Sequence, residues 1–387
     1  MDYRRLNEAD LENKTILLRV DYNVPRRDDG SIADDTRITA SLPTLRYILE
    51  RGGRPIILSH FGRPKGQVHA DMSLEFLTGH LANALGCEVG FQRDFTPSPH
   101  KVVLMENTRF HPGETQGDKD LAQKFAALGD IFVQDAFSCA HRAHVTSSVL
   151  ADYMPAYAGL AMARELDHIA QALDTPAAPV MGIVGGAKVS TKIDLLNSLV
   201  KKLDYLVIGG GMANTFLAAQ NYNVGISLCE HDLIPTAQTI MERAKTSGCD
   251  IILPIDLVVA GEFKAHAKHR VCAPDDVAAQ DMILDAGPES VNHIAALVEQ
   301  VKTLIWNGPL GAFELPPFDT STVELAKYVA KQVKTKDLIA VAGGGDTVAA
   351  LNHAGIAQDF TFISTAGGAF LEWMEGKPLP GVDILKR

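Results

Sequence analysis

The feature that constrains the fold most is a regular alternation of short apolar runs with longer segments of helical periodicity. The runs are rich in leucine and β-branched residues and are too continuously apolar for a strand with one solvent face. Strands of this kind are buried on both faces, as in a parallel sheet covered by helices. The runs lie at residues 15–20, 54–59, 101–105, 130–134, 179–184, 205–209, 250–255, 303–306, 337–342 and 360–364.

The segments between these runs carry recognisable helix ends. Leu42-Pro43 is predicted to open one helix, which Gly52-Gly53 closes. Ser73 is predicted to cap a helix that has leucines on one side and ends at Gly86. Because strands and helices alternate through both halves, we expect an α/β protein with two doubly wound, Rossmann-like parallel-sheet domains.

The predicted seam between the domains lies near residues 155–178. Residues 157–173 have helical periodicity and are followed by the Pro- and Ala-rich stretch DTPAAP. We interpret this segment as a hinge helix that joins the domains, followed by a short linker. The predicted division is a first domain over residues 1–170, a second domain over 171–366, and a C-terminal tail over 367–387.

Charge and composition exclude several classes of function. The net charge of -11 argues against nucleic acid or an anionic membrane as a partner. No apolar run approaches the ~20 residues of a membrane span, and the N-terminal sequence does not resemble a secretory signal. Five scattered cysteines without a C-x-x-C pair indicate reduced thiols in a cytoplasmic protein.

Arginine and glycine are distributed unevenly along the chain. Of the 17 arginines, 14 lie in the first 170 residues, whereas 20 of the 32 glycines lie after residue 170. Arginine binds carboxylates and phosphates through a bidentate fork, and glycine lets backbone amides approach phosphates closely. The two halves are therefore expected to bind different ligands.

Polar residues directly after each strand are the candidates for a site, because ligands of open α/β sheets bind beyond the carboxyl ends of the strands. In the first half, arginines follow three separate strands and a fourth lies nearby: Arg63, Arg109, Arg142 and Arg37. Several arginines at one sheet edge favour an anion pocket over isolated surface ion pairs. His141 and His144 have a spacing that metal ligands use, but hydrogen-bonded histidines are the favoured interpretation, because no third ligand is evident.

Glycine clusters follow the strands of the second half. Lys192 lies in the first turn of an expected helix just after Gly185-Gly186, where a cation is unfavourable unless an anion binds. The sequence GGGDT at 343–347 lies between a strand and a short helix, so its amides are suited to wrap phosphate oxygens. Asp346 is placed to meet a phosphate-bound Mg²⁺, although taken alone it fits a helix N-cap equally well.

Neither common nucleotide-binding fingerprint is present. GGAKVSTK differs from the G-x-x-x-x-G-K-[ST] loop, and residues 209–214 lack the last glycine of G-x-G-x-x-G. We also find no serine elbow and no nucleophile triad. The residues alone leave a nicotinamide-dependent dehydrogenase of the same fold class as an alternative.

The ordered set of strand-end motifs resembles the phosphoglycerate kinase family. The resemblance implies a glycolytic phosphotransferase that interconverts 1,3-bisphosphoglycerate plus ADP with 3-phosphoglycerate plus ATP and uses Mg²⁺. We expect a cytoplasmic monomer whose partners are these small molecules, with no nucleic acid and no membrane. The matching motifs run almost from end to end: RVDYNVP (19–25), DDTRI (34–38), LSHFGRP (58–64), ENTRF (106–110), DAFSCAHRAH (135–144), GGAKVSTKI (185–193), GGGMANTF (209–216), WNGPLGAFE (306–314), GGGDT (343–347) and LPG (379–381).

The resemblance also assigns site residues by motif position. The tail over 367–387 would return to the first domain, and Arg37 and Lys188 would be the catalytic pair closest to the transferred phosphoryl group. The residues that would hold phosphoglycerate are Asp21, Asn23, Arg37, His60, Arg63, Arg109 and Arg142. The residues that would hold the nucleotide, with Asp346 as the metal ligand, are Gly186, Ala187, Lys192, Asn307, Glu314, Gly344, Gly345, Asp346 and Thr347.

The chain departs from the family pattern at three places. Ser138-Cys139 stands where the family usually has Gly-Thr, Ala366 where it has glycine, and Val145-Thr146 where it has a smaller pair. A positive φ at Ala366 would be strained by its Cβ. We expect none of the three to touch the charged residues.

Two mechanistic expectations follow from the resemblance. A carboxylate nucleophile is already ionised at pH 7, so transfer to 3-phosphoglycerate needs no general base. Because reacting atoms must come within ~3–3.5 Å and the two ligand sets lie on different predicted domains, we expect closure around residues 155–178. Among the alternatives, a dehydrogenase would bind NAD(H), and a metabolite sensor would bind phosphoglycerate without turnover.

Overall fold

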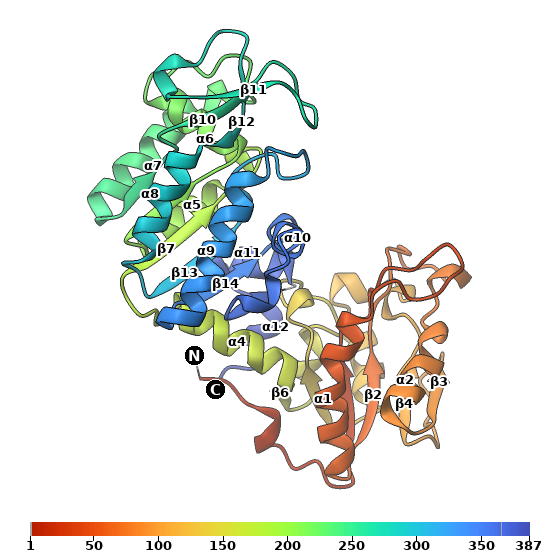
Figure 1. Ribbon diagram of the computed structural model, residues 1–387. Helices are drawn as coiled ribbons and strands as arrows, with labels where there is room; N and C mark the ends of the chain where they lie inside the picture. The colour runs from red at the N-terminus through yellow and green to blue at the C-terminus, as the bar shows by residue number, and fades with distance from the viewer. Residues whose placement is uncertain (1, 365) are drawn as a thin grey trace. The chain divides into compact units, whose positions relative to one another are not determined.

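The computed structural model describes residues 2–364 and 366–387 (Figure 1). The chain divides into two compact units, which we call the N-terminal unit, Met1–Asp167 with Pro378–Arg387, and the C-terminal unit, His168–Lys377. Within the described ranges, no helix combines the length and the hydropathy that crossing a membrane requires.

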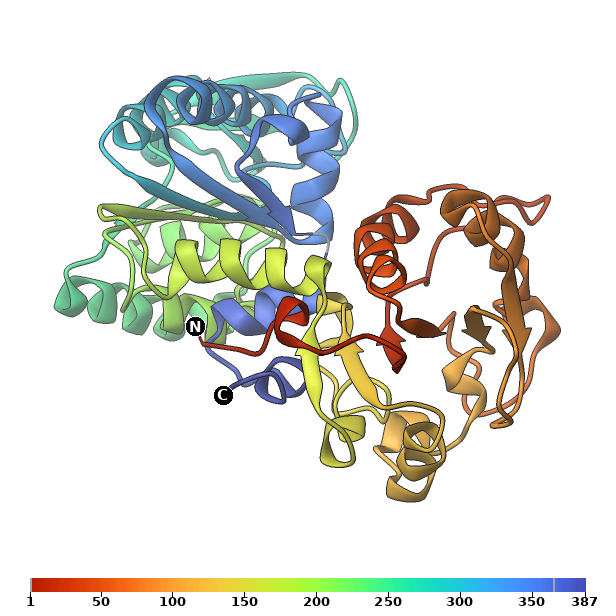
Figure 2. The ribbon, with the colours of Figure 1, turned by 90° about the horizontal axis from the view of Figure 1, so that it is seen from below.

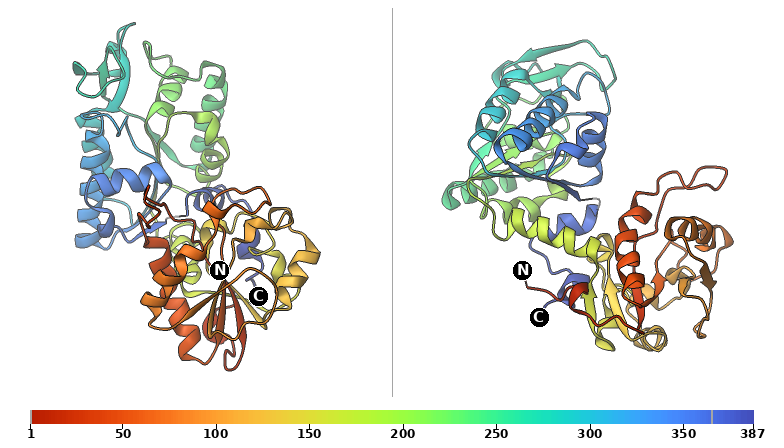
Figure 3. Two further views of the ribbon diagram at one scale, coloured as in Figure 1. Left: turned by 90° about the vertical axis from the view of Figure 1, so that its right-hand side faces the viewer. Right: turned by 60° about the horizontal axis from the view of Figure 1, so that its bottom comes forward.

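The N-terminal unit is built on a parallel sheet whose described strands are ordered β3-β4-β2-β1-β5-β6. Figure 3 shows helices on both faces of this sheet, which confirms the doubly wound arrangement. The strands are β1 (Thr15–Arg19), β2 (Arg54–Leu58), β3 (Val89–Gln92), β4 (Val102–Met105), β5 (Ile131–Gln134) and β6 (Ala156–Ala158). The helices are α1 (Thr36–Glu50), α2 (Thr78–Leu85), α3 (Lys119–Ala126), α4 (Leu160–Leu173), which continues into the C-terminal unit, and α12 (Pro380–Asp383).

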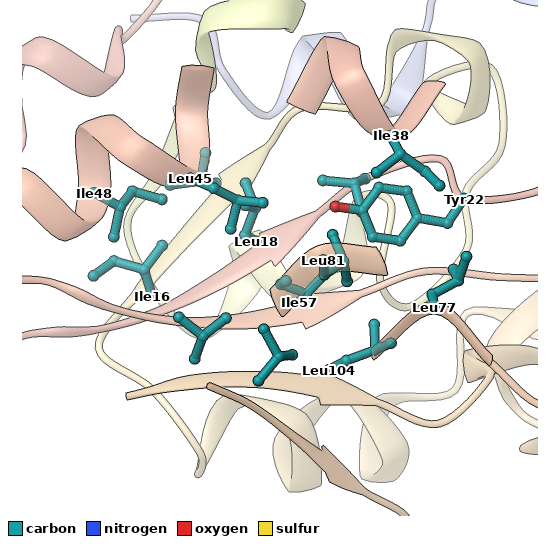
Figure 4. Close-up of a cluster of buried hydrophobic side chains, with 14 of the residues drawn as sticks. Ile16, Leu18, Tyr22, Ile38, Leu45, Ile48, Ile57, Leu77, Leu81 and Leu104 are labelled. Carbon is teal, nitrogen blue, oxygen red and sulfur yellow. The ribbon is translucent and has the colours of Figure 1, made fainter. Parts of the chain in front are cut away.

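Helix α1 packs along the first strand of this sheet. Figure 4 shows Ile38, Leu45 and Ile48 of α1 beside Ile16 and Leu18 of β1, and all five side chains are fully buried. Burial of one such side chain contributes roughly 1.5–3 kcal/mol. The packing fixes α1 across the sheet, so its first turn is held near the carboxyl ends of the strands.

The helix predicted to open at Leu42-Pro43 begins earlier. Helix α1 starts at Thr36 and carries Pro43 in its interior. An interior proline costs about 3 kcal/mol because it removes a backbone hydrogen bond, and the burial of the α1 side chains on both sides of it exceeds that cost. The second predicted helix ends as expected before Gly86, which has a φ of 67°.

The C-terminal unit repeats the plan with a second parallel sheet, whose described strands are ordered β15-β14-β13-β7-β8-β9. Figure 2 shows α8, α9 and α10 on one face of this sheet and α5, α6, α7 and α11 on the other. The strands are β7 (Val180–Val184), β8 (Tyr205–Ile208), β9 (Asp250–Ile252), β13 (Thr303–Asn307), β14 (Ile339–Gly343) and β15 (Phe362–Ser364). The helices are α5 (Ile193–Leu199), α6 (Gly211–Ala219), α7 (Ile234–Ser247), α8 (Pro288–Val298), α9 (Thr320–Lys336), α10 (Gly345–His353) and α11 (Gly367–Met374).

A small antiparallel sheet in the C-terminal unit was not predicted from the sequence. Its strands, labelled together in Figure 1, are β10 (Leu257–Ala260), β11 (His269–Cys272) and β12 (Met282–Ala286), in the order β11-β10-β12. Strand β11 is largely exposed and mixes polar with apolar residues, so it lacks the apolar run that reveals a strand buried on both faces. Strands β3 and β6, at the edges of the N-terminal sheet, were missed as well.

The unit boundary falls inside α4, and the tail is shorter than the predicted range 367–387. Helix α11 packs on α5, with Phe370 and Met374 buried, so residues up to Lys377, including Trp373, belong to the C-terminal unit. Residues Pro378–Arg387 belong to the N-terminal unit, where Leu379 is buried and Tyr3 pairs with Lys386. Burial of the apolar face of α11 explains why that helix stays with the C-terminal sheet.

Candidate functional site

The loops after β1 and β2 are tied together around Arg37. The Nη1 atom of Arg37 donates to Asp21 Oδ2 at 2.7 Å and to the carbonyl of Asn23 at 3.1 Å. The side-chain oxygen of Asn23 accepts from the Gly62 amide at 2.9 Å. Three of the predicted phosphoglycerate residues therefore lie together at the carboxyl edge of the N-terminal sheet.

Further arginines approach the same edge from the other loops. The Nη1 atom of Arg109 donates to the Gly62 carbonyl at 2.7 Å, and Arg142 donates from Nε to His141 at 2.9 Å. Burial lowers the pKa of Arg109, and the charges of Arg19 and Arg142 lower it further, so these guanidinium groups are close in space. Arg63 is exposed on the loop after β2.

His60 is a neutral hydrogen-bond donor. Its Nδ1 atom lies 3.0 Å from Nη2 of Arg19, and a guanidinium can only donate. Nδ1 therefore carries the lone pair, and the proton of the neutral ring is on Nε2. Burial, followed by the charges of Arg19 and Arg109, holds the pKa of His60 well below its ordinary value, so the ring stays neutral at pH 7.

Arg19 is a buried member of the arginine cluster that the sequence analysis did not single out. Its side chain is 1% exposed, and Nη1 lies 3.8 Å from Oε1 of the fully buried Glu114. Nη1 also donates to the hydroxyl of Thr146, which in turn donates to Glu114. Arg19 lies inside the apolar run 15–20 and is the last residue of β1, so a charged residue in a buried strand was the signal that could have revealed it.

Two of the three family departures do contact the charged residues, contrary to expectation. The hydroxyl of Ser138 donates to Asp21 Oδ2 at 2.6 Å, and the buried thiol of Cys139 lies 3.7 Å from Arg19 Nη2. Thr146 bridges Arg19 to its buried carboxylate. The packing of the 137–147 segment beneath the arginines brings these side chains into the cluster, which strand-end spacing does not reveal.

The third departure, Ala366, causes no backbone strain. Its φ is -92°, and it stands at the N-terminal end of α11. A Cβ is therefore accommodated without cost at this position. The neighbouring Thr365 lies outside the described residues.

The cluster of Asp21, His60 and Cys139, with His144 near His60, fits an anion better than a metal ion. Burial and then the charge of Arg109 lower the pKa of His144 to about 4, so this histidine is neutral. Ligand atoms of Asp21, His60 and Cys139 lie within 4.8 Å of one another. However, Asp21 Oδ2 already accepts from Arg37, and three arginines nearby would repel a cation.

In the C-terminal unit, Lys192 is half-buried and lies among oxygen atoms. Its ammonium group donates to the Gly185 carbonyl at 2.6 Å, the Asn307 carbonyl at 3.0 Å and Asn307 Oδ1 at 2.6 Å. Burial lowers the pKa of Lys192 to about 8, an effect that the charge of Asp346 partly counters. Asn307 also donates to the Gly343 carbonyl at 2.9 Å, so it joins the turns after β7, β13 and β14.

The turns after β7 and β13 approach each other so closely that glycine is required where they meet. Gly308 has a φ of 108°, and a Cβ there would collide with the backbone of Gly185. The Gly308 amide donates to the hydroxyl of Thr347 at 2.7 Å, so this predicted nucleotide residue holds the neighbouring turn. Gly344, at a φ of 97°, precedes α10, whose first turn holds Gly345 and Asp346.

A pocket of about 260 Å³ opens beside these turns. Glycine, alanine and leucine line most of it, while Asp346 and Glu314 add carboxylates. Lys188, predicted to be catalytic, is exposed on the segment that follows Ala187. The lining residues include Gly186, Ala187, Gly210, Gly211, Leu228, Phe263, Leu310, Glu314 and Asp346.

Comparisons with known proteins point to one family. A family model described as phosphoglycerate kinase matches residues 6–377. The phosphoglycerate kinase of Azorhizobium caulinodans is 55% identical over 395 residues, covering 100% of this chain and 99% of the relative. That of Caulobacter vibrioides is 55% identical over 396 residues, covering 100% of both chains.

Solved structures give the same result. The structure of phosphoglycerate kinase from Coxiella burnetii is similar with a TM-score of 0.95 and 40% identity, covering 99% of this chain and 98% of that one. The structure from Pyrococcus horikoshii has a TM-score of 0.79 and 26% identity, with the same coverage.

Proposed function

The chain belongs to the phosphoglycerate kinase family, and on that premise we propose how its residues divide the work of the reaction. The enzyme is a glycolytic phosphotransferase that interconverts 1,3-bisphosphoglycerate plus ADP with 3-phosphoglycerate plus ATP. The dehydrogenase alternative finds no support in the family match or in the relatives.

The proposed phosphoglycerate site is the cup at the carboxyl edge of the N-terminal sheet. The observation that carries this assignment is the convergence of Arg37 and Arg109 around a neutral His60, with Arg142 close to Arg109. Guanidinium forks bind carboxylate and phosphate oxygens in two-point contacts. His60 Nε2–H would donate to a substrate oxygen, with Arg63, Asp21 and Asn23 completing the site.

The proposed nucleotide site is the pocket of the C-terminal unit. Its apolar lining suits a base and a sugar, and the close turns around Gly186 and Gly344 present backbone amides for phosphate oxygens. Lys192 is held at the same turns by Asn307, so its charge is fixed where phosphates would lie. Ala187, Glu314, Gly345 and Thr347 belong to the same turns and pocket wall.

The family uses a magnesium nucleotide, and we propose that Asp346 holds the metal. Mg²⁺ is usually bound by one or two carboxylates together with substrate phosphates. Asp346 fits this role because it is exposed in the first turn of α10 and lines the pocket. When bound, the ion would supply positive charge to the phosphate oxygens.

Arg37 and Lys188 are proposed to stabilise the phosphoryl group during transfer. The acceptor carboxylate of 3-phosphoglycerate is ionised at neutral pH, so the protein needs to position and neutralise charge rather than remove a proton. Each charged donor of this type is worth about 10²–10³ in rate. Arg37 is pinned by Asp21, which supports a role in orientation as well as in charge.

The two ligand sets lie on different units, so we propose that transfer requires closure in the segment 155–178, which contains α4. In-line transfer needs reacting atoms within about 3–3.5 Å of each other. Closure also expels water from the reacting groups. Small-angle scattering with both ligands bound should show compaction, and an unchanged radius of gyration would contradict the proposal.

The reaction itself is tested by mixing the protein with ATP, Mg²⁺ and 3-phosphoglycerate. We expect ADP release that depends on all three components. ATP turnover without 3-phosphoglycerate, or none with it, would contradict the assignment. We also propose that the enzyme acts in the cytoplasm as a monomer, and its five free thiols are typical of a reducing compartment.

A further inference from the structure

The loop over residues 220–230, between α6 and α7, is firmly attached to the C-terminal unit. Side chains of α6, the Asp281 carbonyl and Ile283 of β12 hold it at several points, although parts of the loop are exposed. The contacts are Asn214 Nδ2 to the Leu228 carbonyl at 3.1 Å, the Glu230 amide to Thr215 Oγ1 at 3.1 Å, the Ile226 amide to the Asp281 carbonyl at 2.9 Å and the Ile283 amide to Ser227 Oγ at 2.8 Å. The loop therefore presents its side chains from a fixed backbone.

The segment that carries Lys188 is held much less firmly by its own packing. Ala187, Lys188, Ser190 and Thr191 are all exposed, and Val189 is the buried residue among them. The helix that follows, α5, begins only at Ile193. Lys188 thus stands on a largely exposed turn that is anchored by Val189, so contacts from outside the turn contribute to its position.

Glu230 makes such a contact through two hydrogen bonds. Its Oε2 atom accepts from the Ser190 amide at 2.9 Å, and its Oε1 atom accepts from the Ser190 hydroxyl at 2.6 Å. The Thr191 hydroxyl closes the turn by donating to the Lys188 carbonyl at 2.8 Å. A two-point contact to an ionised carboxylate is stronger and more directional than a neutral hydrogen bond.

We propose that Glu230 is a positioning residue for Lys188, holding the turn at 188–191 so that the ammonium group meets the transferred phosphoryl group. The inference rests on the role proposed above for Lys188. Leu228, two residues earlier on the same loop, lines the nucleotide pocket. The loop thus links the wall of the nucleotide pocket to the turn that carries the catalytic lysine.

The test is a double-mutant cycle between Glu230 and Lys188, read in kcat. We expect Glu230→Ala to lower kcat by about ten- to hundredfold, because small displacements of a catalytic group cost that much. Glu230→Gln keeps one accepting oxygen and should lose less. In a Lys188→Ala background the same Glu230 substitutions should have no further effect, since they act through that lysine.

The KM for 3-phosphoglycerate should stay unchanged, because that substrate is proposed to bind the other unit. Glu242→Gln, an exposed carboxylate on α7, is the matched control and should leave kcat as it is. Hydrogen exchange at the Ser190 amide gives a readout independent of turnover and should be faster in Glu230→Ala.

The outcomes separate this inference from the function on which it rests. If Lys188→Ala slows turnover but Glu230→Ala acts equally in both backgrounds, or not at all, then Glu230 does not position Lys188. If Lys188→Ala keeps normal turnover, both proposals about these residues fail. If the wild-type protein releases no ADP, the error lies in the assigned reaction.

Discussion

The candidate ligand-binding groups of the N-terminal unit are long side chains, whereas those of the C-terminal unit are mainly backbone groups of glycine-rich turns. In the first, Arg37 at the start of α1 and Arg109 in the turn after β4 lie at the same edge of the sheet, and hydrogen bonds to Asp21 and Gly62 hold them there. In the second, Gly185 and Gly308 meet so closely that no Cβ fits between them. Two sheets of the same parallel, doubly wound type thus offer different kinds of donor to their proposed anionic ligands.

The difference has a consequence for tolerance to substitution. In a site built from side chains, a single substitution removes one donor, and the neighbouring side chains can adjust. A backbone site depends on turns that exclude any side chain, so one methyl group disturbs several donors together. The predictions below use this contrast and run from the largest expected effect to the smallest.

Gly308→Ala should be the most damaging change. The new Cβ would meet the Gly185 backbone at a φ of 108°, so the turns that hold Lys192 must separate. We expect a loss of about 4 kcal/mol in the free energy of unfolding, the range of severe single substitutions. Urea unfolding measures it, with Gly261→Ala, an open position, as the near-neutral control. Equal stability of the two variants would refute the close-approach argument.

Arg37→Ala and Lys188→Ala should each lower kcat by about 10²–10³, with little effect on unfolding. Both side chains are at least partly exposed, so their removal leaves no buried cavity. Steady-state kinetics of ADP release measures the loss, and Lys202→Ala, an exposed lysine on the same unit, should behave as wild type. Near-normal turnover in either variant would remove that residue from the mechanism.

The two units should also respond differently to pH. The pKa of Lys192 is about 8 instead of 10.5, so the free protein loses this charge as pH rises through 8. Anionic phosphates favour the charged form, so ADP binding above pH 8 should take up a proton and weaken by about tenfold per pH unit at most. The arginine cup keeps its charge, so 3-phosphoglycerate affinity should stay flat from pH 7 to 9.

Calorimetry in buffers with different ionisation enthalpies measures the proton uptake directly. Binding of 3-phosphoglycerate over the same pH range is the internal control. ADP binding without proton uptake at pH 9 would show that Lys192 does not face the phosphates.

The smallest effects are expected at the departures from the family pattern. Ser138→Gly removes a hydrogen bond to Asp21, which is worth about 1 kcal/mol, and should raise the KM for 3-phosphoglycerate several-fold. Ala366→Gly relieves no strain, because φ is already -92°, and should cost at most about 1 kcal/mol of stability. A gain in activity from Ala366→Gly would contradict this account, as would an unchanged KM in Ser138→Gly.

Elements with a strong local signal were predicted well. Most of the parallel strands, and the helix that begins within GGGDT, were predictable because apolar runs and glycine turns are properties of neighbouring residues. The start of α1 was predicted wrongly because Pro43 is a local signal that tertiary burial outweighs. Of the missed antiparallel strands, β11 lacks a continuous apolar run because it is largely exposed.

By itself the sequence determined the α/β class, the family and the edge of each sheet where ligands would bind, because these follow from periodicity and from motifs in order. Only the tertiary structure decided the partners of individual polar groups. The pairing of Arg19 with Glu114 through Thr146, and of Glu230 with Ser190, joins residues separated by tens of positions. Such contacts depend on how packed elements meet in space, which no local pattern encodes.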